Sequence, residues 1–172
     1  MFKIKLLILL LISFFLFSCT ENKIQNFNNK YSLDYISGEY DGLVLKNILT
    51  SYLLSFDLYD NNSTLQIKSS ISHSPTLYIT NIDNTSDRVN IESSINVKIV
   101  NQRNECEVYS FDKTLSQFYI FADSDKFVSN DKAQEKIKRE NTETLVKSFI
   151  NNLYITEQKC SSKILKIREK YY

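Results

Sequence analysis

From residue 89 to residue 99, apolar and polar side chains alternate. One set points one way and consists of Val89, Ile91, Ser93, Ile95, Val97 and Ile99. The other set is Asn90, Glu92, Ser94, Asn96 and Lys98. Because successive side chains of a strand point to opposite faces, this period of two predicts a strand with one buried face and one wet face. That arrangement is typical of an antiparallel sheet covered on one side.

Three further segments extend the predicted sheet. Apolar and polar residues alternate over residues 31–36, which predicts a short first strand. They also alternate over residues 65–72, which predicts a half-buried second strand. Ser74-Pro75 is expected to break or bulge that second strand, with residues 77–79 either continuing it or forming a separate piece. After a turn at residues 101–104, residues 106–118 return as the partner strand, with Tyr109, Phe111 and Leu115 on one face.

Two segments change to the period of a helix. Apolar residues between Leu43 and Phe56 recur at spacings of three and four, with Asp41 as the expected cap. A longer helix begins near Ser129 or Asn130, with apolar residues from Ala133 to Leu153. Two one-sided helices and a one-sided sheet bury their apolar faces together as a two-layer sandwich. We therefore predict an α+β fold, with two helices packed on one face of a mostly antiparallel sheet.

The amino terminus has the layout of a bacterial lipoprotein signal. Basic residues come first, an apolar run extends from Leu6 to Phe17, and Ser18-Cys19 closes it. Cleavage would make Cys19 the first mature residue, carrying a covalent diacylglycerol and acyl lipid. An ordinary signal peptide and a retained anchor are the alternatives, although a membrane span needs roughly 20 apolar residues. An Asp directly after the cysteine would favour retention in the inner membrane. Thr20 occupies that position and therefore favours the outer membrane, with the protein on its periplasmic side.

We divide the chain into a signal peptide (1–18), a lipidated tether (19–30), an α/β domain (31–155) and a charged tail (156–172). Cleavage removes Lys3 and Lys5 from the 21 basic residues and none of the 20 acidic ones, so the mature charge is −1. This balance argues against a nucleic-acid partner. Cys106 and Cys160 remain, and an oxidising compartment permits either a disulfide or two unpaired thiols.

The residue types needed for catalysis are scarce. The one histidine, His73, is interpreted as a surface residue, and no second His or Cys-x-x-Cys pair supports a zinc site. Two glycines do not make a phosphate-binding loop. Asp123, Asp125 and Asp131 are interpreted as loop and helix-capping residues. We therefore expect a binding or assembly protein rather than an enzyme, with no cofactor apart from the lipid on Cys19.

The order of these segments resembles the LptE family of lipopolysaccharide-assembly lipoproteins. The resemblance runs from Cys19 through the early strand and helix to Arg88 before the strand at residues 89–99. It continues through the aromatic segment 118–127 to a helix that carries Ala133, Ile137, Arg139, Leu145, Ile150 and Leu153.

The resemblance implies a plug inside a large outer-membrane β-barrel of the LptD type, which helps to insert lipopolysaccharide into the outer membrane. Phosphorylated lipid heads require cations, and position along the family order suggests Arg88, Lys126 and Lys132 as the contacts. Two other functions stay open: a lipoprotein that binds another envelope partner, such as a regulator of peptidoglycan synthesis, and a surface lipoprotein that interacts with a host.

Overall fold

The computed structural model describes residues 29–78, 88–121, 127–155 and 160. The predicted signal peptide, most of the tether, Lys126 and nearly all of the tail lie outside these residues. Within them the elements are four strands and two helices, in the order β1 (Ser32–Ser37), α2 (Glu39–Ser55), β2 (Leu65–Tyr78), β3 (Arg88–Asn101), β4 (Cys106–Ile120) and α3 (Phe127–Leu153).

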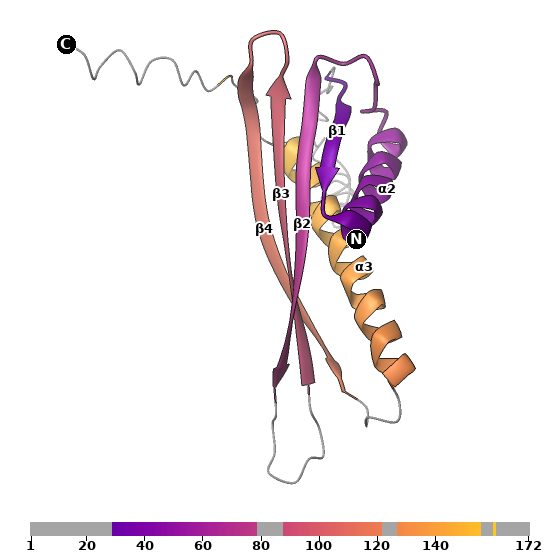
Figure 1. The fold of residues 1–172 in the computed structure, drawn as a ribbon. Coiled ribbons are helices and arrows are strands. Elements are labelled where there is room, and N and C mark those ends of the chain that lie inside the picture. The colour runs from indigo at the N-terminus through magenta and orange to yellow at the C-terminus, as the bar shows by residue number, and fades with distance from the viewer. Residues whose placement is uncertain (1–28, 79–87, 122–126, 156–159, 161–172) are drawn as a thin grey trace, which may run out of the picture.

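The strands form one open sheet in the order β1-β2-β3-β4. Strands β2, β3 and β4 are antiparallel neighbours, whereas β1 pairs with β2 in parallel. A parallel pair needs a crossover connection, and α2 supplies it. Both helices lie on the same side of the sheet (Figure 1). The predicted α+β fold, with two helices on one face of a mostly antiparallel sheet, is therefore confirmed.

The core lies between this helix-covered face and the two helices. In β3 every odd-numbered residue from Val89 to Ile99 is buried, as the alternation predicts. The aromatic ring of Phe149 in α3 packs against Tyr109 and Phe111 of β4, with ring centroids 6.1 and 5.7 Å apart. The other buried helix residues of this core are aliphatic: Leu45, Leu49, Leu53, Leu145, Val146, Ile150 and Leu153.

The expected break at Ser74-Pro75 was wrong. Strand β2 is continuous to Tyr78, and Pro75 pairs in register with Ile91 of β3. The reason is the short length of β1, which pairs with β2 only between Gln66 and Ser70. Pro75 therefore lies where β2 is an edge strand, and a residue that lacks an N–H is tolerated at an edge.

The cap of α2 also differs from the prediction. The helix begins at Glu39, with Gly38 as the capping residue at φ 122°, so Asp41 lies inside the first turn. Gly42 packs so tightly on the end of β1 that a Cβ there would stand 2.7 Å from the carbonyl oxygen of Ser37. Both glycines are therefore used at one chain reversal. Helix α3 begins at Phe127, two or three residues before its expected start at Ser129 or Asn130.

Candidate functional site

Arg88 opens β3 on the face of the sheet that the helices leave uncovered. The strand register places Tyr78, Arg88 and Ile120 in one row, and Phe118 lies in the next row on the same face. The guanidinium carbon of Arg88 stands 5.3 Å from the centroid of the Phe118 ring, a cation–π distance. We call these four residues the tip patch.

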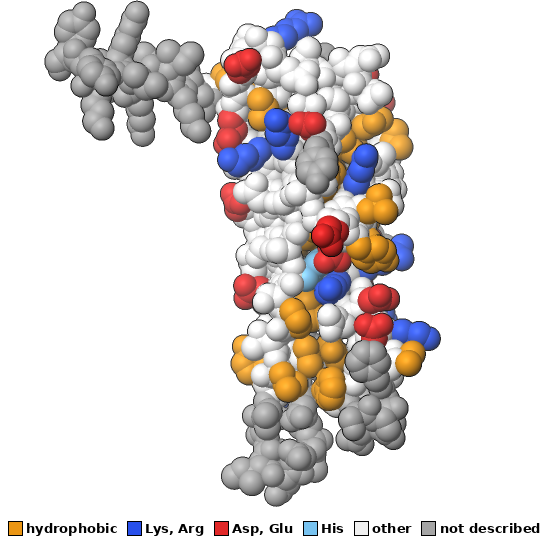
Figure 2. Space-filling model, viewed as in Figure 1, with side chains coloured by type: hydrophobic (Ala, Val, Ile, Leu, Met, Phe, Trp, Pro, Cys, Tyr) orange, Lys and Arg blue, Asp and Glu red, His pale blue; other side chains and the backbone are white. Residues whose placement is uncertain are grey.

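The tip patch is exposed although three of its members are large and apolar. Tyr78 is 53% exposed, Phe118 62% and Ile120 67%. Hydrophobic side chains gather at this end of the molecule, where β2 ends and β3 begins (Figure 2). Exposed apolar groups grouped around a cation are typical of a binding surface rather than of a solvated one.

Beyond the tip patch, the uncovered face is mostly polar, with Val100 as an apolar exception. Its side chains are small or hydrogen-bonded across strands: Ser94 Oγ lies 2.8 Å from Thr114 Oγ1, and Asn96 donates to Asp112. Lys98 forms an ion pair with Glu107 at 3.3 Å. The remaining positions of this face in the three long strands include Ser70, Ser72, Ser74, Thr76, Asn90, Glu92, Ser110 and Ser116.

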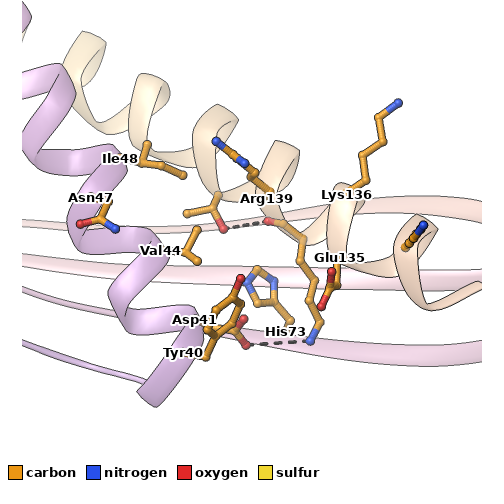
Figure 3. Close-up of a pocket in the computed structure, with 12 residues that line it drawn as sticks. Tyr40, Asp41, Val44, Asn47, Ile48, His73, Glu135, Lys136 and Arg139 are labelled. Carbon is orange, nitrogen blue, oxygen red and sulfur yellow. Dashed lines mark hydrogen bonds and ion pairs between the residues drawn. The ribbon is translucent and has the colours of Figure 1, made fainter. Parts of the chain in front are cut away.

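A cavity of about 500 Å³ lies on the opposite side, between α2 and α3 and above β2 (Figure 3). We call it the interhelix groove. One wall is α2, and the other is α3. The lining residues are Tyr40, Asp41, Val44, Asn47, Ile48, His73, Lys132, Glu135, Lys136, Lys138, Arg139 and Thr142.

His73 forms the floor of the groove and belongs to a polar chain that enters the core. Its Nδ1 lies 2.8 Å from Ser93 Oγ. The buried Asn141 of α3 donates from Nδ2 to the same Ser93 Oγ at 2.9 Å. Since Ser93 Oγ already accepts this hydrogen bond, its hydroxyl proton can be donated to His73 Nδ1, which favours the neutral ring. Burial lowers the pKa of His73; the charge of Asp41 opposes this shift, and that of Lys138 adds to it.

Two polar contacts join the helices along the groove. Lys138 Nζ lies 3.9 Å from Asp41 Oδ2, beside His73. Further along, Tyr52 donates its hydroxyl proton to Glu143 Oε1 at 3.1 Å. Burial, together with this contact to the Glu143 carboxylate, raises the pKa of Tyr52. These two contacts join α2 to α3 at the groove and beyond it.

The structure separates the predicted contact residues. Arg88 belongs to the tip patch, whereas Lys132 lines the interhelix groove on the helix-covered side. Cys19 and Lys126 lie outside the described residues. Cys106 and Cys160 are joined in a disulfide with Cα atoms 5.5 Å apart. Within the described ranges, no group of His, Cys, Asp or Glu is placed to hold a metal ion, and neither helix is long and apolar enough to cross a membrane.

The sequence alone does not predict most of the groove. It favours a surface position for His73, whereas the ring is half-buried between the sheet and α3. The sequence feature that indicates part of the groove is the spacing of Lys132, Lys136 and Arg139. It places three cations on one stripe of α3. Periodicity along one helix does not reveal which other helix lies beside that stripe.

No family model matches the chain, and no curated protein matches it in sequence. Similar folds do occur among solved structures. A minor lipoprotein from Acinetobacter baumannii superposes with a TM-score of 0.56 at 15% identity, covering 74% of this chain and 91% of that one. The rare lipoprotein B from Shewanella oneidensis gives 0.56 at 12% identity, with 73% and 93% covered. A protein of Caulobacter crescentus described as a lipoprotein gives 0.53 at 16% identity, with 73% and 88% covered. The chain therefore has the fold of these bacterial lipoproteins.

Proposed function

We propose that this chain is an outer-membrane lipoprotein, anchored on the periplasmic side through acylated Cys19, that plugs a large LptD-type β-barrel and helps it to insert lipopolysaccharide. The observation that carries the proposal is the fold. It matches about nine-tenths of each of two lipoproteins and covers nearly three-quarters of this chain. The lipoprotein-like leader and the order of segments that resembles LptE add to it.

The uncovered face of the sheet supports a plug. The interior wall of an outer-membrane barrel is polar. A face of Ser, Thr and Asn side chains, with its charges largely paired as in Lys98–Glu107, can meet such a wall through direct and water-mediated hydrogen bonds. An apolar face would leave the polar groups of the wall unpaired, at a cost of about 1–3 kcal/mol for each buried group.

The tip patch supports contact with a phosphorylated lipid. Arg88 supplies a guanidinium, which pairs with phosphate through two parallel hydrogen bonds. The exposed Tyr78, Phe118 and Ile120 beside it offer apolar surface for an acyl chain. Lys126, from the segment before α3, is a further cation in this proposal; the resemblance also suggests Lys132, which lines the interhelix groove on the other side of the sheet.

Affinity purification from detergent-solubilised outer membranes tests the plug. The expected result is one integral β-barrel protein, several times the mass of this chain, bound in equal amount. The variant Ser72→Arg/Ser116→Arg places two bulky cations on exposed positions of the uncovered face and should reduce the recovered barrel at least tenfold. Gln102→Arg, in the turn between β3 and β4, is the matched control and should recover it normally. Recovery of no barrel with the unaltered chain would refute the proposal.

Metabolic labelling with palmitate tests the anchor. The unaltered chain should take up label and fractionate with the outer membrane, whereas Cys19→Ala should take up none, because the modified sulfur is absent. Cys160→Ala is the control and should label normally. Label retained in Cys19→Ala would disprove the assignment of the acylated residue.

A further inference from the structure

We propose that the interhelix groove binds a small amphiphilic anion, with its apolar chain on the α2 wall and its phosphate on the cations of α3. The inference goes beyond the plug, because the groove is formed by this chain alone and needs no barrel. Its volume of about 500 Å³ falls within the range of roughly 300–1,000 Å³ that is usual for small-molecule sites.

The α2 wall carries an apolar stripe beside two polar residues, Asp41 and Asn47. Tyr40, Val44 and Ile48 are four residues apart, so their side chains form one stripe along the helix. Tyr40 is 70% exposed, so its ring is an aromatic surface that a ligand in the groove can reach. Figure 3 shows Tyr40 and Val44 on the side of α2 that faces His73. This wall can cover a hydrocarbon chain but offers little to a bare anion.

The α3 wall carries more positive charge than the carboxylates around it neutralise. The lining contains four cations and two carboxylates. Lys138 is paired with Asp41, and Lys136 lies 3.8 Å from Glu140. Lys132 and Arg139 have no ion-pair partner among the described residues, which leaves them available to an anion. Glu135 offsets one charge, and the lining remains net positive.

The charge of the chain's own carboxyl-terminal segment argues against that segment as the occupant. Residues 161–172 contain four basic side chains, Lys163, Lys166, Arg168 and Lys170, and one acidic residue, Glu169. A basic segment would be repelled by Lys132 and Arg139. An apolar wall opposite a cationic wall instead fits a ligand with both an acyl or alkyl part and a negative headgroup.

The single histidine provides a site-specific probe. Because His73 is the one histidine of the chain and forms the groove floor, its ring Cε1–H group gives one NMR signal when only this chain carries ¹³C-labelled histidine and no histidine tag. We would titrate the mature protein in phosphatidylcholine nanodiscs with hexyl phosphate. Inorganic phosphate tests binding of the phosphate group alone. Hexyl glucoside tests binding of the hexyl group without a charged headgroup.

Hexyl phosphate should shift the His73 signal saturably, with an affinity at least tenfold above that of either partial probe. The double variant Lys132→Gln/Arg139→Gln should lower the affinity for hexyl phosphate at least tenfold, and Val44→Asn should lower it several-fold. Lys147→Gln, an exposed lysine of α3 outside the groove, should leave it unchanged. Equal binding of hexyl glucoside, or an undiminished affinity in the double variant with native circular dichroism, would overturn the proposal. Neither result bears on recovery of the barrel, so the two proposals fail separately.

Discussion

His73 illustrates how one residue acquires its properties from its neighbours. Along the chain it lies in a Ser/Thr-rich stretch beside a proline. In the fold its side chain lies on the helix-covered face, because it pairs with Ser93 in the register of β2 and β3. Ser93 and Asn141 are buried, so the ring exchanges water for the hydrogen bond to Ser93. Burial of an imidazole disfavours its charged form, which is why the pKa of His73 falls below 6.5.

This lowered pKa makes stability depend on pH. Below 6.5 the unfolded chain binds a proton on His73 before the folded chain does, so the free energy of unfolding falls as the pH drops from 6.5 through the folded pKa. Above 6.5 the ring is neutral in both states and contributes no slope. Urea denaturation between pH 5 and 7.5 should show this slope in the unaltered protein and lose it in His73→Asn. An unchanged slope in the variant would assign the effect to carboxylates.

At the scale of elements, the entry to α2 decides how the first helix sits on the sheet. Strand β1 ends at Ser37, and α2 starts at Glu39, so the chain reverses at Gly38 and Glu39, both of which have a positive φ. The positive φ of Gly38 is a conformation that side-chain-bearing residues rarely adopt. Gly42 then lets the first turn of the helix lie directly against the backbone of β1.

Gly42→Ala should therefore destabilise the protein. In an ordinary helix interior this substitution stabilises by about 1 kcal/mol. Here the new methyl group would meet backbone 2.7 Å away, and overpacking of this kind costs about 1–3 kcal/mol. Urea denaturation measures the change. Ser51→Ala, at an exposed position of the same helix, is the control and should alter stability by less than about 0.5 kcal/mol. A stabilised Gly42→Ala variant would show that the close approach is absent.

At the scale of the whole molecule, the two ends of the sheet differ. The disulfide lies at the end where β3 turns into β4, since Cys106 pairs with Asn101. The tip patch lies at the other end, where Arg88 pairs with Ile120. A 14-residue strand spans about 46 Å at roughly 3.3 Å per residue. One end is thus covalently closed, and the other carries exposed apolar side chains.

Reduction of the disulfide should lower stability without altering the tip patch. The bridge closes a separation of 54 residues, which corresponds to about 4 kcal/mol in the chain-entropy account. Urea denaturation with and without dithiothreitol measures this loss. Cys106→Ser/Cys160→Ser should match the reduced protein and not respond to dithiothreitol. Equal stability of the oxidised and reduced protein would show that the cross-link adds nothing to folding.

The alternation between residues 89 and 99 and the spacing of apolar residues in the helices were sufficient to predict the strands, both helices and the α+β class. Each of these signals is local: a side chain's face follows from its own position in a strand or a helix. The same patterns also predicted which face of β3 is buried. The lipid-bearing Cys19 is still a prediction from its segment alone.

Only the tertiary structure placed Pro75 on an open edge, brought His73 under α3, and separated Arg88 from Lys132. Each of these depends on which elements are neighbours and on how far they overlap. The short β1 leaves half of β2 without a partner on its outer edge, and the approach of α3 to α2 creates the groove. Periodicity specifies the face of an element, whereas its neighbours are determined by how all the apolar faces pack at once, and that is a property of the folded chain as a whole.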